Sequence, residues 1–140
     1  MRAAPSRIPG SALGLLAAVV GLLAAVVLGA CSSTEPSGLH TDFVVAVGQE
    51  RFVVRSTDPE TIRLATLNFQ GRNQVFPLGP LRRGDGGFNG PWSWHLDPAE
   101  TRFVEAAIEV CDGAPSYVEA NLDAFPTYCP WGGRVVSIRR

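Results

Sequence analysis

An apolar run near the N-terminus decides how much of this chain is available to fold. Residues 12–28 contain only Ala, Leu, Val and Gly, Arg2 and Arg7 precede them, and the first acidic residue is Glu35. A positively charged start followed by a short apolar segment is typical of an export signal. The run is also short for a membrane-spanning helix, which needs about 20 apolar residues. We therefore expect residues 1–30 to be a signal peptide outside the fold.

The end of this run resembles the lipobox of bacterial lipoproteins. Leu28 is followed by two small residues and then by Cys31, the residue that would be acylated and would begin the mature chain. One acyl chain anchors a protein only marginally, so stable attachment needs the multiple acylation that the resemblance implies. The alternatives are a secretory signal with an incidental cysteine and an uncleaved membrane anchor. Because Ser32 is not the Asp that retains such lipoproteins at the inner membrane, the choice of membrane stays open.

The residues after Cys31 have the composition of a flexible tether. They are polar, contain one proline and one glycine, and lack periodicity as far as Thr41. The predicted organisation is a signal peptide over 1–30, a lipidated cysteine and tether over 31–41, and a single domain over 42–140. The protein would be attached to the bacterial cell envelope through the lipid on Cys31 and would face the periplasm or the exterior.

The charge of the exported chain excludes one class of partner. Residues 31–140 carry ten Arg, no Lys and thirteen acidic residues, which gives a net charge of about −3. Domains that bind nucleic acids need a clear basic excess. We therefore expect no nucleic-acid partner.

Two cysteines remain if Cys31 is acylated. Cys111 and Cys129 would lie in an oxidising compartment, where paired cysteines form disulfides; the alternative is two buried free thiols. A bond between them would contribute roughly 3 kcal/mol in the chain-entropy model. A zinc ribbon is excluded because the sequence has no Cys-x-x-Cys motif and no paired histidines.

The first half of the domain has the pattern of a hairpin followed by a helix. Residues 43–47 and 51–55 are β-branched and aromatic and are joined by a short loop containing glycine. Residues 58–60, Asp-Pro-Glu, supply an N-cap, a first-turn proline and an acid at the positive end of the helix dipole, which predicts a helix over 59–70. Residues 74–81 contain two prolines without amide donors, so we expect an edge strand or an extended segment.

The second half is more ambiguous. Residues 92–96 alternate as a strand with one apolar face. Residues 102–111 alternate like a half-buried strand but follow a good helix start; we favour a strand that forms a hairpin across a turn at Asp97. A short helix is expected within 115–123 and a final strand at 135–138. The predicted fold is α+β: a mostly antiparallel sheet, two short helices on one face and one disulfide.

Three blocks of sequence resemble a known family. Residues 91–98 are PWSWHLDP, residues 108–119 are IEVCDGAPSYVE, and residues 128–131 are YCPW. They are similar to the N-terminal domain of a slime-mould calmodulin-binding protein, a domain that also occurs alone in small secreted bacterial proteins. The resemblance covers roughly residues 43–138 and implies no enzymatic activity. The segment between 122 and 129 is shorter here than in the family.

The calmodulin label of that family does not carry over to this chain. A calmodulin target is a basic amphipathic helix, whereas the first predicted helix offers only Arg63 and the second is acidic. The chain also lacks the Asp-rich loop with a closing Glu that defines an EF-hand.

The candidate binding residues surround a Gly-rich loop at 82–90. They are Arg82, Arg83, Asp85, Phe88, Asn89, Trp92, Trp94, His95, Asp97 and Trp131. The tryptophans suit either an aromatic platform or the core, and the loop is either a contact surface or an idle connection. We expect a non-enzymatic domain that binds a protein or a glycan.

Two alternative functions are considered. A small hydrolase would use His95 with Asp97 or Asp112 as an acid–base pair, although no Ser or Cys lies in a nucleophile elbow. A calcium-dependent module would take its oxygen ligands from Asp85, Asn89, Asp97, Glu100 and Asp112. Several of these residues equally suit turns and caps, so no catalytic residue, metal or cofactor is assigned.

Mass spectrometry of the native protein from its own cell envelope tests the anchor and the disulfide together. We expect a mature chain that begins at an acylated Cys31 and in which Cys111 and Cys129 resist thiol alkylation until they are reduced. An unmodified Cys31, or free thiols at the other two positions, would contradict these expectations.

Overall fold

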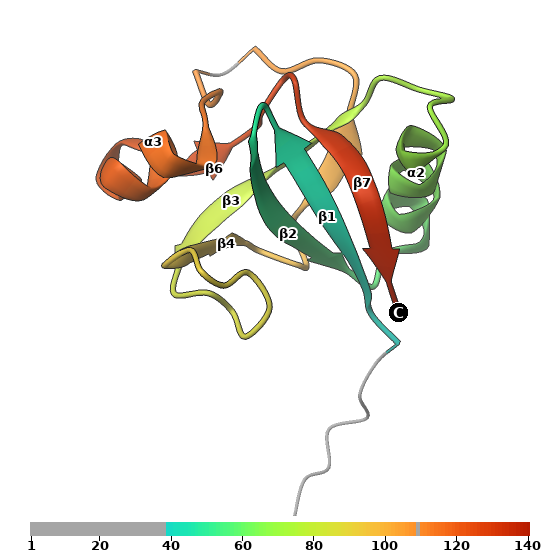
Figure 1. Ribbon diagram of the computed structural model, residues 1–140, viewed down its shortest axis with the longest axis horizontal. Helices are drawn as coiled ribbons and strands as arrows, with labels where there is room; N and C mark the ends of the chain where they lie inside the picture. Colours follow the sequence, from blue (N-terminus) through green and yellow to red (C-terminus); the bar gives the residue numbers. More distant parts are fainter. Residues whose placement is uncertain (1–38, 109) are drawn as a thin grey trace, which may run out of the picture. The chain divides into compact units, whose positions relative to one another are not determined.

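The computed structural model describes residues 39–108 and 110–140, and all of them lie in the unit Ser37–Arg140. Its elements are β1 (Thr41–Val47), β2 (Glu50–Ser56), α2 (Pro59–Phe69), β3 (Phe76–Arg83), β4 (Trp94–Leu96), β5 (Arg102–Val104), α3 (Pro115–Ala120), the 3₁₀ turn η1 (Leu122–Ala124), β6 (Thr127–Tyr128) and β7 (Arg134–Arg139) (Figure 1). The predicted signal peptide and Cys31 lie outside the described residues. Within the described residues, no helix has the length and apolar character that crossing a membrane requires.

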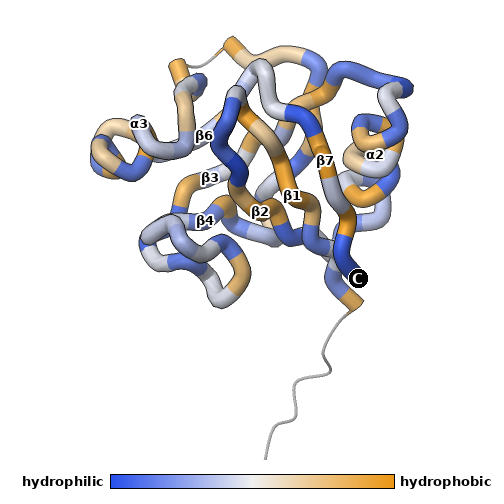
Figure 2. Tube along the Cα trace, viewed as in Figure 1, coloured by the Kyte–Doolittle hydropathy of each residue, from blue (hydrophilic) through white to orange (hydrophobic). Residues whose placement is uncertain are grey.

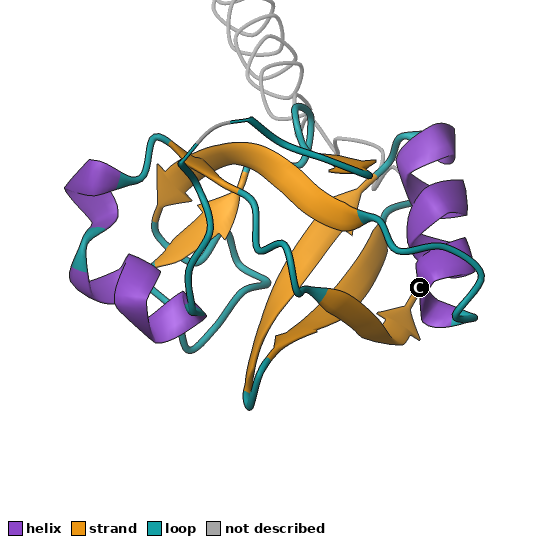
Figure 3. Ribbon diagram, turned by 90° about the horizontal axis from the view of Figure 1, so that it is seen from above, coloured by secondary structure: helices purple, strands orange, loops and turns teal. Residues whose placement is uncertain are grey.

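The strands form two sheets in which every pairing is antiparallel. One sheet has the order β2-β1-β7; in the other, β3 pairs with β4, β5 and β6 (Figures 1 and 3). The register of β1 and β2 runs from Thr41 opposite Ser56 to Val47 opposite Glu50. The loop between them is therefore Gly48-Gln49, and Gly48 adopts the positive φ of 59° that such a tight turn favours. The predicted hairpin, final strand and α+β class are confirmed.

The core is built from alternate residues of the strands. Phe43 and Val45 of β1 are fully buried, as expected when one face of a strand is apolar, and Figure 2 shows the apolar colour along this strand. The rings of Trp94 and Tyr128 pack against Phe52 with centroid separations of 5.5 and 5.4 Å. The core therefore joins β1 and β2 to strands of the second sheet.

Helix α2 begins and ends where the sequence predicts. The Asp58 side chain accepts a hydrogen bond from the Thr61 amide at 2.7 Å, and Gly71 follows the helix with a φ of 70°. The helix packs on β7, where Asn68 Oδ1 accepts from the Val135 amide at 2.8 Å.

Helix α3 lies at the opposite end of the domain from α2 (Figures 1 and 3), so the prediction that both helices share one face is wrong. The cause is a long-range cap. The Glu50 carboxylate, at the tip of the β1–β2 hairpin, accepts from the Ser116 amide at 2.7 Å and from its hydroxyl at 2.6 Å. This cap fixes the start of α3 beside the hairpin.

Strand β3 is not the edge strand that its prolines predict. Its residues 76–78 pair with β5, 79–80 with β6 and 81–83 with β4. The prolines are tolerated because Pro80 contributes its carbonyl, which accepts from the Asp97 amide at 2.9 Å, while the next donor comes from Leu81. Gly79 is required because a Cβ there would lie 2.3 Å from Thr101 Oγ1.

Only the start of residues 102–111 forms a strand, β5, and the rest runs as a loop in which Ile108 and Val110 are fully exposed. The predicted hairpin at Asp97 is also wrong, because β4 and β5 both pair with β3 and not with each other. The disulfide between Cys111 and Cys129 is present and buried. It holds residue 111 beside β6, so the chain leaves the sheet well before this cysteine.

Side chains occupy the outer edges of the three-stranded sheet. On β2, the Val53 amide donates to Asn89 Oδ1 at 2.6 Å, and the Arg51 carbonyl accepts from Trp92 Nε1 at 2.7 Å. On β7, Asn68 takes the corresponding place at Val135. Such capping prevents an exposed edge from pairing with another strand.

We expect Asn89→Ala to destabilise the protein by about 2 to 4 kcal/mol. The Asn89 amide is completely buried and also donates to the Trp94 carbonyl at 2.7 Å, so its loss leaves two buried backbone groups without partners. Urea unfolding measures the effect. The control is Asn121→Ala, which removes one exposed hydrogen bond to Tyr117; equal midpoints for the two variants would refute the role of Asn89.

Candidate functional site

The structure places two of the predicted binding residues in the interior. Asn89 and Trp94 are both completely buried, so neither is available to a ligand, and we correct their assignment to the core. Trp92 is partly buried, with its ring 6.0 Å from that of Trp94. The Gly-rich loop is therefore a cover over the edge of β2, and the tryptophans do not form a common platform.

His95 and its proposed acid partners are not brought together. His95 Nδ1 lies 2.7 Å from the Gly84 carbonyl oxygen, and its ring meets Phe88 edge-on at 5.4 Å. Asp97 instead accepts from Arg82 Nε at 2.9 Å, and Asp112 accepts from the Trp131 amide at 3.0 Å. The acid–base pair on which a hydrolase would depend is therefore not assembled.

The acidic residues considered for calcium also have protein partners. Arg82 bridges Asp97 and Glu100 at 2.9 and 3.0 Å, and Asp85 accepts from the Gly87 amide at 2.9 Å. In the described part of the chain, no three His, Cys, Asp or Glu side chains gather in a way that could hold a metal ion. The other predicted arginine, Arg83, pairs with exposed Asp123.

Asp97 serves as the anchor of a tight turn. Its pKa is lowered, first by the hydrogen bond from the Ala99 amide and then by the bond and charge of Arg82. Its carbonyl also accepts from the Thr101 amide at 2.9 Å. These contacts reverse the chain after β4 and explain Asp97 without a catalytic role.

Trp131 is the predicted binding residue that is both exposed and rigidly held. Its side chain is 54 % exposed, and it lies in the turn Pro130–Gly133, which is closed by a hydrogen bond from the Gly133 amide to the Pro130 carbonyl at 2.9 Å. A Cβ on Gly133 would lie 2.9 Å from that same oxygen, so the turn needs glycine. The Asp112 side chain holds the Trp131 amide, and the preceding residue but one, Cys129, is fixed by the disulfide.

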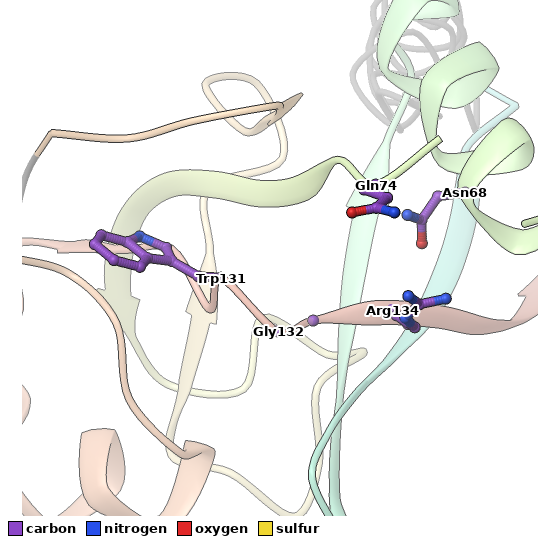
Figure 4. A pocket seen from close by; sticks show the side chains of 6 residues that line it. Asn68, Gln74, Trp131, Gly132 and Arg134 are labelled. Atoms are coloured by element: carbon purple, nitrogen blue, oxygen red, sulfur yellow. The ribbon is translucent and has the colours of Figure 1, made fainter. Parts of the chain in front are cut away.

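Two hollows meet at Trp131. The smaller encloses about 100 Å³ and is lined by Asn68, Gln74 and residues 131–134 (Figure 4). The larger encloses about 370 Å³ and is lined by Gln74, Phe76, residues 105–107 and Trp131. Because Gln74 and Trp131 line both, the hollows form one surface, which we call the Trp131 groove. A third hollow, of about 280 Å³, is lined only by the consecutive residues 120–124, so no separate segments converge on it.

Three polar side chains of the Trp131 groove are free to bind a ligand. Gln74, Glu105 and Arg134 make no side-chain hydrogen bond or ion pair with other described residues. In Figure 4, Gln74 and Arg134 lie across from each other, with Trp131 at the far end of the smaller hollow. Asn68, by contrast, spends its amide on the Val75 carbonyl and the Val135 amide. The groove thus offers an aromatic surface, a hydrogen-bond acceptor, a donor and an amide that does both.

Sequence reasoning found Trp131 but not the residues around it. Gln74, Glu105 and Arg134 belong to three separate segments, and no motif links them. The local signal was Pro130-Trp131-Gly132-Gly133, which predicts a tight turn that exposes its second residue.

Comparison with known proteins identifies one family. The model of the N-terminal domain of the slime-mould calmodulin-binding protein matches residues 40–140, which confirms the resemblance drawn from the three sequence blocks. No curated protein and no solved structure matches the chain.

The lowered pKa of Asp97 predicts a specific dependence of stability on pH. Because the folded pKa lies below the ordinary value of 3.8, ionised Asp97 stabilises the fold above that value, and this contribution is lost as the pH falls through the folded pKa. We expect Asp97→Asn to be less stable than the wild type at neutral pH, and the difference to shrink below about pH 4. Urea midpoints at both pH values test this, with exposed Asp123→Asn as the control. A difference that is the same at both pH values would contradict the prediction.

Proposed function

This chain belongs to the family of the slime-mould calmodulin-binding protein N-terminal domain, and we propose that it is a lipid-anchored protein of the bacterial cell envelope whose domain binds a ligand at the Trp131 groove without catalysis. The observation that carries the binding role is the rigid, half-exposed Trp131 at the junction of two hollows. The anchor rests on the lipobox-like sequence that ends at Cys31.

A tryptophan held in this way favours ligand binding. Leaving a large aromatic ring in water forfeits hydrophobic free energy that a ligand would recover. Tryptophan is also enriched among the few residues that carry most of the affinity of an interface. The turn fixes Trp131 before any ligand arrives, so little conformational entropy is lost on binding.

The partners of the acid–base candidates favour binding over catalysis. His95 lies at a backbone carbonyl, Asp97 anchors a turn and Asp112 holds the Trp131 amide. Each of these contacts has a structural purpose, and Asp112 directly supports the proposed binding residue.

A lipid on Cys31 would also limit where the ligand can lie. Strand β1 begins at Thr41, so the intervening chain spans at most about 35 Å even when fully extended. The ligand would then be a component of the envelope close to the membrane, either a protein or a glycan.

Binding to isolated cell envelopes tests the role of Trp131. The full chain is used with Cys31→Ser throughout, so that acylation does not contribute to sedimentation with the membrane. We expect Trp131→Ala to weaken binding about tenfold, as loss of a central aromatic anchor does.

The matched control is Tyr117→Ala, which removes an aromatic side chain of similar exposure, 58 %, from α3 outside the groove. We expect it to bind like the parent. Equal binding by the parent and Trp131→Ala, with thermal melts showing both folded, would reject the Trp131 groove as the binding site.

A further inference from the structure

We infer that the ligand of the Trp131 groove is a glycan, with a sugar ring stacked on the indole of Trp131 and its hydroxyls bound by Gln74, Glu105 and Arg134. This inference rests on the proposed function and deepens it by naming the class of ligand.

The polar side chains of the groove match the hydrogen-bonding character of a sugar. Each sugar hydroxyl can both donate and accept, and the groove supplies an amide that does both at Gln74, an acceptor at Glu105 and a donor at Arg134. None of the three is engaged by another described side chain or backbone group, so binding would break no internal hydrogen bond. One acid and one base also leave the groove without net charge, which suits an uncharged ligand.

The aromatic side chain matches the apolar face of a sugar ring. A pyranose presents C–H groups on its faces and hydroxyls around its rim, and a tryptophan ring offers a flat apolar surface of comparable width. Trp131 separates the two hollows, and Gln74 reaches both. A ring on Trp131 would therefore have hydrogen-bonding groups on either side. The larger hollow, at about 370 Å³, falls within the size range of small-ligand sites.

A peptide partner fits the same surfaces less well. Addition of a strand needs a free sheet edge, but Asn89 and Trp92 occupy the edge of β2, and Asn68 occupies that of β7. Insertion of an amphipathic helix needs a groove with several apolar subsites. Apart from Trp131, the apolar side chains here are those of Phe76 and two alanines.

The test uses cell-envelope material digested exhaustively with protease, and a second sample of it oxidised with periodate, which cleaves the vicinal diols of sugars. We expect the full chain with Cys31→Ser to bind the digested material as well as it binds intact envelopes, and periodate to lower binding at least tenfold. Gln74→Ala should weaken binding several-fold, and Trp131→Phe should bind better than Trp131→Ala. Tyr117→Ala should have no effect.

The outcomes separate this inference from the proposed function. If binding to intact envelopes depends on Trp131 but is lost after digestion, or survives periodate, the glycan is overturned and the groove remains a binding site for another ligand. If no binding depends on Trp131 in any material, both the glycan and the proposed function are overturned.

Discussion

A buried side-chain amide takes the place of a strand between the two sheets. Asn89 accepts from Val53 on β2 and donates to the Trp94 carbonyl at the start of β4, so one residue satisfies backbone groups in both sheets. Its position depends on the loop between β3 and β4, whose Trp92 covers the same edge. The domain thereby closes around its aromatic core without a continuous ladder, and the covered edge is withdrawn from interaction with other chains.

The disulfide and the Trp131 groove belong to the same part of the fold. Cys129 is bonded to Cys111 and lies two residues before Trp131, while Asp112, next to Cys111, holds the Trp131 amide. The staple that stabilises a small exported domain therefore also orders its proposed binding surface. A rigid scaffold that presents functional residues on its connecting segments is a common arrangement in proteins.

Several residues whose chemistry indicates function prove to be structural. Glu50 caps α3 from another element, and Glu119 accepts from both the amide and the hydroxyl of Ser93. Asp97 anchors a turn, and His95 lies at a carbonyl. In a domain with short strands and few backbone ladders, polar side chains must satisfy many backbone groups. Residue type alone could not separate these structural roles from catalysis or metal binding.

The sequence by itself determined the features that depend on near neighbours: the β1–β2 hairpin, the caps of α2, the pairing of two cysteines and the three blocks that identify the family. The tertiary structure decided the central place of β3, the burial of Trp94 and Asn89, the exposure of Ile108, and the meeting of Gln74, Glu105 and Arg134 around Trp131. Caps and turns follow from the backbone preferences of a few consecutive residues. Strand order and grooves depend instead on contacts between segments far apart in the chain, which local patterns do not encode.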